Sequence, residues 1–200
     1  MAHNIWIARA LLISGLCALM VGAHLIDVLL GGSLKSFGIH PRDMGSAYTI
    51  VTAPWLHGSF THLGSNLAAF VVLGALCMLN GIRYFLKASA LIIIVGGALV
   101  WLFGRDATHI GASGWIFGLW SLAIALAWFD RSFGNIAISI AVIFFYGGMV
   151  WGVLPTQAYI SFESHLFGAV AGVFAAFILS NRQVVATPPM RPTPRIKFWP

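Results

Sequence analysis

The strongest constraint on this fold is a series of long apolar runs. They cover approximately residues 5–30, 62–79, 85–103, 113–128, 133–152 and 162–180. A helix needs about 20 apolar residues to cross the hydrocarbon core of a bilayer, and each run is near that length. Only helices and closed barrels satisfy their backbone hydrogen bonds inside lipid. We therefore expect an all-α membrane protein in which residues 1–180 form six transmembrane helices.

Composition agrees with a membrane location and argues against nucleic acid as a partner. Of the 200 residues, 60% are hydrophobic and only 8% are charged, so a water-soluble globule would lack polar surface. The net charge of +6 comes from basic residues in short loops and in the C-terminal tail, where they set orientation in the lipid bilayer. Cys17 and Cys77 both lie in apolar runs. Neither a disulfide framework nor a metal site is indicated, and we expect no cofactor.

Charge also predicts the orientation, because six spans place both termini on one side. That side holds eight basic residues, against three on the other side. The eight are Arg9, Arg83, Lys87, Arg131, Arg182, Arg191, Arg195 and Lys197, and the three are Lys35, Arg42 and Arg105. Because basic residues concentrate in cytoplasmic loops, we expect both termini in the cytoplasm of a bacterial cell, with the chain in its plasma membrane.

Three further stretches complete the organisation. The first run is too long for a signal peptide and lacks a small-residue cleavage site, so we interpret it as a retained helix. Residues 31–61 contain charged residues, two prolines and two histidines. This first outer loop is amphipathic, and we expect it at the interface or packed on the helices. Residues 181–200 contain five prolines and four basic residues, which predicts a disordered cytoplasmic tail.

Polar residues gather at the predicted outer ends of the second, fourth and sixth spans. His62 and Asn66 open the second span, Ser113 opens the fourth, and His165 opens the sixth. Helices that start on one face at similar depth can bring these groups together. His62 and Asn66 are four residues apart and share a helix face. Because polar groups inside a membrane are costly, they are candidate functional residues.

The surroundings of Ser113 suit a nucleophile. Gly111 and Gly114 leave its hydroxyl sterically open and let backbone N–H groups approach the atom that the oxygen attacks. Structural alternatives remain for each candidate. Ser113 could cap a helix, His62 and Asn66 could form interhelical hydrogen bonds, and His165 could be a histidine at the level of the lipid headgroups.

Two rows of small residues predict a close helix pair. The first row is Gly114, Gly118, Ser121 and Ala125, and the second is Gly168, Gly172 and Ala176. Small residues four apart let helix backbones approach closely. If the rows face each other, Ser113 and His165 lie at the same end of the pair. Generic membrane packing is the alternative explanation of either row alone.

Together these residues resemble the rhomboid family of intramembrane serine proteases. The matching motifs are His57-x4-His62-x3-Asn66, Gly111-Ala112-Ser113-Gly114-x3-Gly118 and His165-x2-Gly168-x3-Gly172, and the likeness extends from residues 37–42 through the sixth span. The resemblance implies that Ser113 is the nucleophile and His165 the general base of a dyad. It implies an oxyanion hole made by His62, Asn66 and the backbone N–H of Ser113, with a supporting role for His57.

The chain departs from the family pattern in two places. Many relatives have a tyrosine shortly after the nucleophile, on which the histidine stacks, whereas this chain has Phe117, which keeps the ring and loses the hydroxyl. The tryptophan-arginine pair of the first outer loop in many relatives is absent. Neither change removes a group that transfers a proton.

The few acidic residues and the other histidines give further expectations. Glu163 is nearest to His165 in sequence, but residues two apart on a helix do not face each other. Asp106 stays open as a third catalytic member through the outer loop. We interpret His109 as a loop histidine in water. His24 and Asp27 could pair with each other or with the first outer loop.

The resemblance implies cleavage of transmembrane protein substrates near the outer membrane face. Peptide bonds in a regular helix are hidden, so we expect helix-weakening residues in the cleaved segment, and the family suggests a small residue before the scissile bond. A catalytically inactive relative that binds transmembrane clients is the alternative. A small transporter would need an internal repeat or a polar face through the bilayer, and the sequence has neither.

Overall fold

The structure is a computed structural model that describes residues 2–155 and 160–184. Within those residues the chain is helical, with connecting loops and one isolated backbone bridge between Ile39 and His109. The α-helices are α1 (Ala2–Leu29), α2 (Thr49–Thr52), α3 (Phe60–Cys77), α4 (Ile82–Leu91), α5 (Gly97–Phe103), α6 (Ser113–Phe129), α7 (Phe133–Tyr146) and α8 (Phe162–Val184). Short 3-10 turns flank several of them, and a π-helical turn, η5 (Ile92–Gly96), joins α4 to α5.

Five helical segments are long and apolar enough to cross a membrane. They are Asn4–Leu29, Phe60–Asn80, Ile82–Phe103, Phe133–Val153 and Phe162–Ser180. Each coincides with one of the predicted spans, so the long apolar runs predicted the helices correctly. Large apolar side chains are exposed along these segments, among them Leu11, Ile140 and Phe144. Such a surface requires lipid, and the protein is an integral membrane protein.

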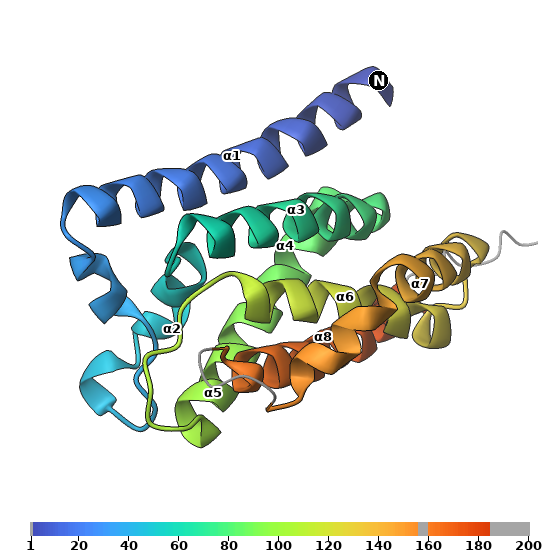
Figure 1. Ribbon diagram of the computed structural model, residues 1–200. Helices are drawn as coiled ribbons and strands as arrows, with labels where there is room; N and C mark the ends of the chain where they lie inside the picture. The colour runs from blue at the N-terminus through green and yellow to red at the C-terminus, as the bar shows by residue number, and fades with distance from the viewer. Residues whose placement is uncertain (1, 156–159, 185–200) are drawn as a thin grey trace, which may run out of the picture.

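The prediction of six spans is not confirmed, because α6 is shorter than the others. It has 17 residues, which at 1.5 Å per residue make about 26 Å, less than the ~30 Å hydrocarbon core. Figure 1 shows α6 in the middle of the bundle, between α3 and α8. Its side chains are largely buried, including Trp115, Leu119 and Leu122. A helix enclosed by other helices does not need to match the thickness of the lipid.

The two rows of small residues do face each other, as the sequence predicted. A Cβ atom added at Gly168 would collide with the backbone carbonyl of Gly114, and one at Gly172 would collide with the carbonyl of Gly118. The Ser121 hydroxyl donates a hydrogen bond to the Ala169 carbonyl across the pair, at 2.7 Å. The backbones of α6 and α8 therefore touch, and the first turns of both helices lie at one end of the pair.

The first outer loop packs on the bundle, one of the two expected arrangements. It contains η1 (Ser33–Phe37), η2 (Met44–Ser46), α2 and η3 (Ala53–Trp55). The Arg42 guanidinium donates a hydrogen bond to the Gly104 carbonyl at 2.7 Å, which joins the loop to the end of α5. Asp27 pairs with this loop, as one alternative predicted, because it accepts a hydrogen bond from the Leu34 N–H at 2.9 Å.

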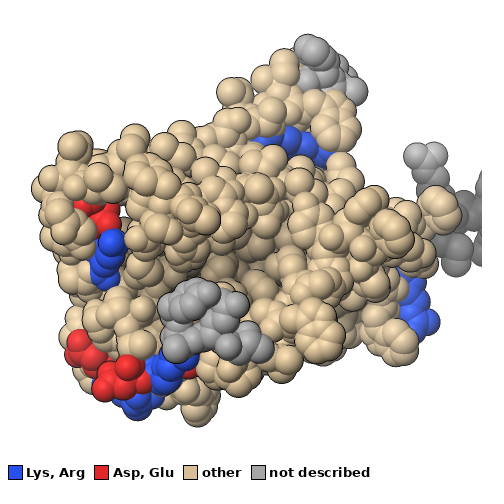
Figure 2. Space-filling model, in the orientation of Figure 1, with Lys and Arg blue, Asp and Glu red and all other residues tan. Residues whose placement is uncertain are grey.

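Charge distinguishes the two ends of the molecule. On the face drawn in Figure 2, acidic side chains gather at the end that holds α2 in Figure 1, while basic side chains occur at both ends.

The last helix, α8, continues to Val184, at the C-terminal end of the described residues. The predicted tail at 181–200 therefore begins with helix, and residues 185–200 lie outside the described residues.

Candidate active site

The residues predicted as nucleophile, base and oxyanion-hole donors line one cavity. It has a volume of about 790 Å³, and its walls include Ser113 and Phe117 of α6, His62 and Asn66 of α3, and His165 of α8. The first turns of α3, α6 and α8 therefore open on the same space, although they are distant in sequence. The sequence predicted this convergence from the shared direction of the three helices.

Ser113 does not serve as a helix cap. It is the first residue of α6, Ala112 occupies the N-cap position, and no side chain caps this helix. The capping alternative for Ser113 is therefore wrong. As the first helical residue, Ser113 also has a backbone N–H without a partner inside the helix. Its hydroxyl and its N–H are both free to act at the cavity.

Gly111 fits the site for two independent reasons. Its φ angle is +115°, which side chains rarely adopt. A Cβ atom there would also lie 2.7 Å from Nε2 of His62 and 3.5 Å from Nδ2 of Asn66. Only glycine lets the loop before Ser113 approach these two polar side chains so closely.

His62 and Asn66 both present hydrogen-bond donors beside Gly111. The Gly58 N–H donates to Nδ1 of His62 at 3.4 Å, so in the neutral ring Nε2 carries the proton. Nδ2 of Asn66 is buried without a hydrogen-bond partner among the described residues. Interhelical hydrogen bonds were the structural alternative for His62 and Asn66, and among the described residues their side chains form none. A buried donor without a partner costs free energy. Such a donor is typical of a site where a ligand supplies the acceptor.

His165 is held by a carbonyl and an aromatic ring. Its Nδ1 lies 2.8 Å from the Gly152 carbonyl oxygen, and its ring stacks on Phe117 with centroids 4.1 Å apart and planes 7° apart. A carbonyl can only accept, so Nδ1 carries the proton and Nε2 of the neutral ring is a free acceptor. That is the tautomer a general base needs. Phe117 thus supplies the ring on which the histidine stacks, where many relatives have a tyrosine.

Gly152 is the functional residue that sequence reasoning missed. It lies in η6 (Gly147–Val153), a 3-10 segment that follows α7. A Cβ atom at this position would come within 2.6 Å of the Phe117 ring and 3.3 Å of Nδ1 of His165. The predicted fifth span continued as a regular helix to residue 152, which hid the 3-10 turn. The cluster of Gly147, Gly148 and Gly152 was the available signal.

Ser113 and His165 face the same cavity, but no hydrogen bond joins their side chains in the structure. Catalytic hydrogen bonds are often long in unliganded enzymes and shorten when substrate binds. The structure therefore brings the two groups to one cavity, and their direct pairing stays a prediction.

The His57 ring packs against the His62 ring. The two ring centroids are 5.1 Å apart with the rings nearly edge to face, and the His57 side chain is almost fully buried. Burial, with a smaller contribution from nearby His62, lowers the pKa of His57 to about 4. His57 is therefore neutral at pH 7, and its contact with His62 suits the supporting role predicted for it.

No carboxylate orients His165 among the described residues. Glu163 forms an ion pair with Arg105, with 3.4 Å between Oε1 and Nε, and so turns toward the outer loop. This agrees with the expectation that Glu163 and His165 do not face each other. Asp106 makes no side-chain hydrogen bond in the described structure. The Gly152 carbonyl lies against Nδ1 of His165, where an acid would lie in a catalytic triad.

The prediction for His109 is wrong. Only 2% of this residue is exposed, and its ring nitrogens bond to the Ser161 hydroxyl and to the Arg105 carbonyl. Its backbone exchanges two hydrogen bonds of 2.9 Å with Ile39 of the first outer loop. This pairing with a sequence-distant loop buries the side chain, and the local sequence gave no sign of it.

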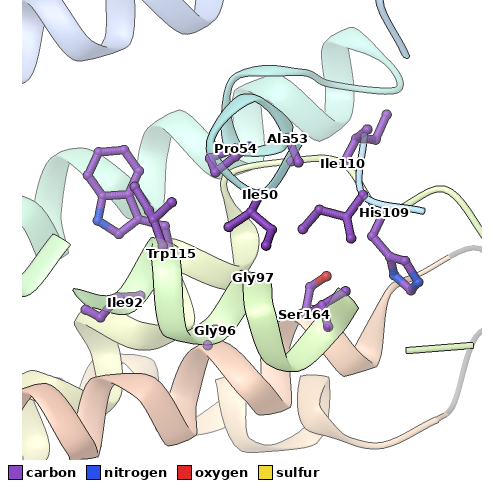
Figure 3. A pocket seen from close by; sticks show the side chains of 16 residues that line it. Ile50, Ala53, Pro54, Ile92, Gly96, Gly97, His109, Ile110, Trp115 and Ser164 are labelled. Atoms are coloured by element: carbon purple, nitrogen blue, oxygen red, sulfur yellow. The ribbon is translucent and has the colours of Figure 1, made fainter. Parts of the chain in front are cut away.

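A second and much smaller cavity lies behind the first. Its volume is about 40 Å³, room for one water molecule, and it is bordered by Gly111 and Gly114. Figure 3 shows His109 and Ser164 at one end of it and Trp115 and Ile92 at the other. His109 contributes to the walls of both cavities.

Comparisons with known proteins find one family model and several relatives. The family model described as Rhomboid domain matches residues 44–182. An uncharacterized protein of Mycobacterium tuberculosis is 38% identical, with 88% of this chain and 77% of that protein covered. The chloroplastic rhomboid-like protein 11 of Arabidopsis thaliana is 30% identical over 67% of this chain and 53% of its own length. A Bacillus subtilis protein named as a candidate rhomboid protease is 28% identical over 70% of each chain.

Proposed function

The chain belongs to the rhomboid family, and on that premise we propose that it is an intramembrane serine protease. Its substrates would be the transmembrane segments of other membrane proteins, cleaved near the outer membrane face. One observation carries the proposal: a hydroxyl, a neutral imidazole and two side-chain donors line a single cavity. Both termini would lie in the cytoplasm, because the predicted cytoplasmic side carries most of the basic residues.

The proposed reaction begins with a proton transfer. Nε2 of His165 would accept the Ser113 proton while Oγ attacks the peptide carbonyl carbon, and would then give that proton to the leaving amine. Water would next hydrolyse the acyl-enzyme with His165 again as base. The Gly152 carbonyl would hold the charged imidazolium in place, because its hydrogen bond to Nδ1–H strengthens when the ring becomes positive.

The oxyanion would form beside Gly111. Nε2–H of His62, Nδ2–H of Asn66 and the Ser113 N–H would donate to it. The first two already lie around Gly111 without another acceptor among the described residues. Donors fixed before the reaction cost no reorganisation when charge develops, and each is worth roughly 3 kcal/mol of barrier.

A catalytically inactive, client-binding relative is the second candidate function. Cleavage separates the two. The purified chain in liposomes would be incubated with a fluorescently labelled transmembrane peptide, with and without an alkylphosphonate inhibitor. We expect cleavage in wild type, none with the inhibitor, and none in Ser113→Ala. The fold of this variant should persist because serine is already a small residue. Uncleaved peptide that still binds tightly to wild type would favour the inactive relative.

A further inference from the structure

A chain of hydrogen bonds leads from the loop before Ser113 to the first turn of α8. Nδ1 of His109 lies 2.6 Å from Oγ of Ser161. That Oγ lies 2.7 Å from Oγ of Ser164 and accepts the Ser164 N–H at 3.2 Å. The Ser161 carbonyl in turn accepts the His165 N–H at 3.3 Å.

The direction of these bonds follows from counting donors and acceptors. Nε2 of His109 lies 3.1 Å from the Arg105 carbonyl, which can only accept, so Nε2 carries the proton. In the neutral ring Nδ1 is then an acceptor, and the Ser161 hydroxyl donates to it. Oγ of Ser161 has two lone pairs left, and Ser164 fills both with its O–H and its N–H.

The surroundings keep His109 neutral. Burial lowers its pKa, the Arg105 carbonyl and the Glu163 carboxylate raise it, and the Arg105 guanidinium and the His40 ring lower it further. Those three side chains are the titratable or charged groups that act on the ring. At neutral pH the acceptor at Nδ1 is therefore present.

The same counting excludes a second nucleophile. Ser161 and His109 form a closely hydrogen-bonded hydroxyl and imidazole pair on the cavity wall. A nucleophilic oxygen needs a free lone pair, and both lone pairs of Ser161 accept bonds from Ser164. The hydrogen-bonded pair of His109 and Ser161 therefore fixes the position of the start of α8.

We propose that His109 is a positioning residue for His165, a proposal that rests on the protease function proposed above. Through Ser161, His109 fixes the first turn of α8 relative to the loop that carries Ser113. The glycine contacts hold α6 and α8 together along their length, whereas the His109 bond sets their relative position at the site. Its backbone pairing with Ile39 also ties this point to the first outer loop.

The test uses the full chain in lipid nanodiscs and two substitutions at one position. His109→Leu keeps similar volume and removes the acceptor, while His109→Asn places a carbonyl oxygen near the position of Nδ1. We expect His109→Leu to lower kcat for the labelled peptide by about tenfold, because small misplacements of catalytic groups are costly. KM should change little. His109→Asn should restore most of kcat, and Ser36→Ala, a control at an exposed serine of the first outer loop that bonds locally to the Ser33 carbonyl, should resemble wild type.

A double-mutant cycle separates positioning from general destabilisation. If His109 acts through Ser161, His109→Leu with Ser161→Ala should lose no more kcat than the worse single variant. Additive losses would overturn the proposal. So would an unchanged kcat in His109→Leu, or a decrease that merely follows a lower melting temperature.

A measurement without catalysis keeps this proposal distinct from the protease proposal. In protein with ¹⁵N-labelled histidine, the ring signals of His165 report its hydrogen bond to Gly152. We expect sharp signals in wild type and His109→Asn, and shifted or broadened signals in His109→Leu. If wild type neither cleaves peptide nor reacts with phosphonate, the protease proposal is wrong. The His165 ring signals alone then test the positioning role of His109. Identical His165 signals in His109→Leu would overturn the positioning role.

Discussion

Asn66 combines a cost in stability with the oxyanion role proposed for it. Its side-chain nitrogen is buried and has no partner in the described structure, and a buried donor without a partner destabilises a fold by about 1–3 kcal/mol. Such a donor is retained where a ligand or transition state supplies the acceptor. In this site the oxygen of a tetrahedral intermediate would be that acceptor.

We therefore expect Asn66→Ala to lower kcat about 100-fold or more without lowering the melting temperature. Phosphonate labelling of Ser113 should be slower but still detectable, because the dyad is intact. Cleavage rates and thermal melts of the variant measure both effects, with Ser65→Ala, the preceding residue in the same cavity wall, as the comparison. A fully active Asn66→Ala variant would mean that Asn66 does not stabilise the oxyanion.

His57 should make the stability of the fold depend on pH. Its pKa is lowered to about 4 by burial and by the neighbouring rings of His62 and His24, while a histidine in an unfolded chain titrates near 6.5. As the pH falls from about 6.5 toward 4, His57 takes up a proton in the unfolded chain but stays neutral in the folded chain. The free energy of unfolding therefore decreases across this range, by about 3 kcal/mol in total.

The measurement is the melting temperature of the protein in detergent between pH 7.5 and 4.5. We expect it to decrease as the pH falls in wild type and to vary less in His57→Phe, which keeps an aromatic ring against His62. An equal pH dependence in the two proteins would show that His57 does not carry the effect.

At the scale of elements, the pair of α6 and α8 is the unit on which the site depends. These helices bring Ser113 and His165 to one cavity because glycines let their backbones touch. A side chain at Gly168 would meet the Gly114 backbone, which cannot rotate away as a flexible side chain would.

Gly168→Ala should therefore push the helices apart. We expect a loss of about 1–3 kcal/mol of stability from overpacking and a larger loss of cleavage, because the first turns of α6 and α8 move apart. Gly15→Ala on α1 is the matched control, since a Cβ atom there meets nothing within 4 Å. That control should leave stability and cleavage close to wild type. Equal effects of the two substitutions would contradict close packing of α6 on α8.

At the scale of the whole molecule, the sequence predicted what depends on hydrophobic length and on helix direction. Five long helices and the convergence of Ser113 and His165 on one cavity followed from those two properties, and the packing of Gly168 on Gly114 followed from the spacing of small residues. The prediction for His109 was wrong, and the prediction of α6 as a sixth span is not confirmed, because both depend on which segments enclose them. The short length of α6 is possible only at the centre of the bundle, and His109 is buried by its pairing with Ile39.

Gly152 shows the same limit. Its role arises from a 3-10 turn that brings one carbonyl to the His165 ring. Apolar periodicity does not distinguish the end of such a span from regular helix. Contacts between a backbone atom and a distant side chain leave only a weak trace in one sequence, here a cluster of glycines.

The central claim is that Ser113 and His165 act as one catalytic pair. The most direct test is reaction of the membrane-embedded protein with a fluorophosphonate, followed by peptide mass spectrometry of wild type and His165→Asn. We predict a single phosphonyl group on Ser113 in wild type and labelling at least about 100-fold slower in His165→Asn, because the general base is lost. Labelling of another residue, or undiminished labelling of Ser113 in His165→Asn, would contradict the claim.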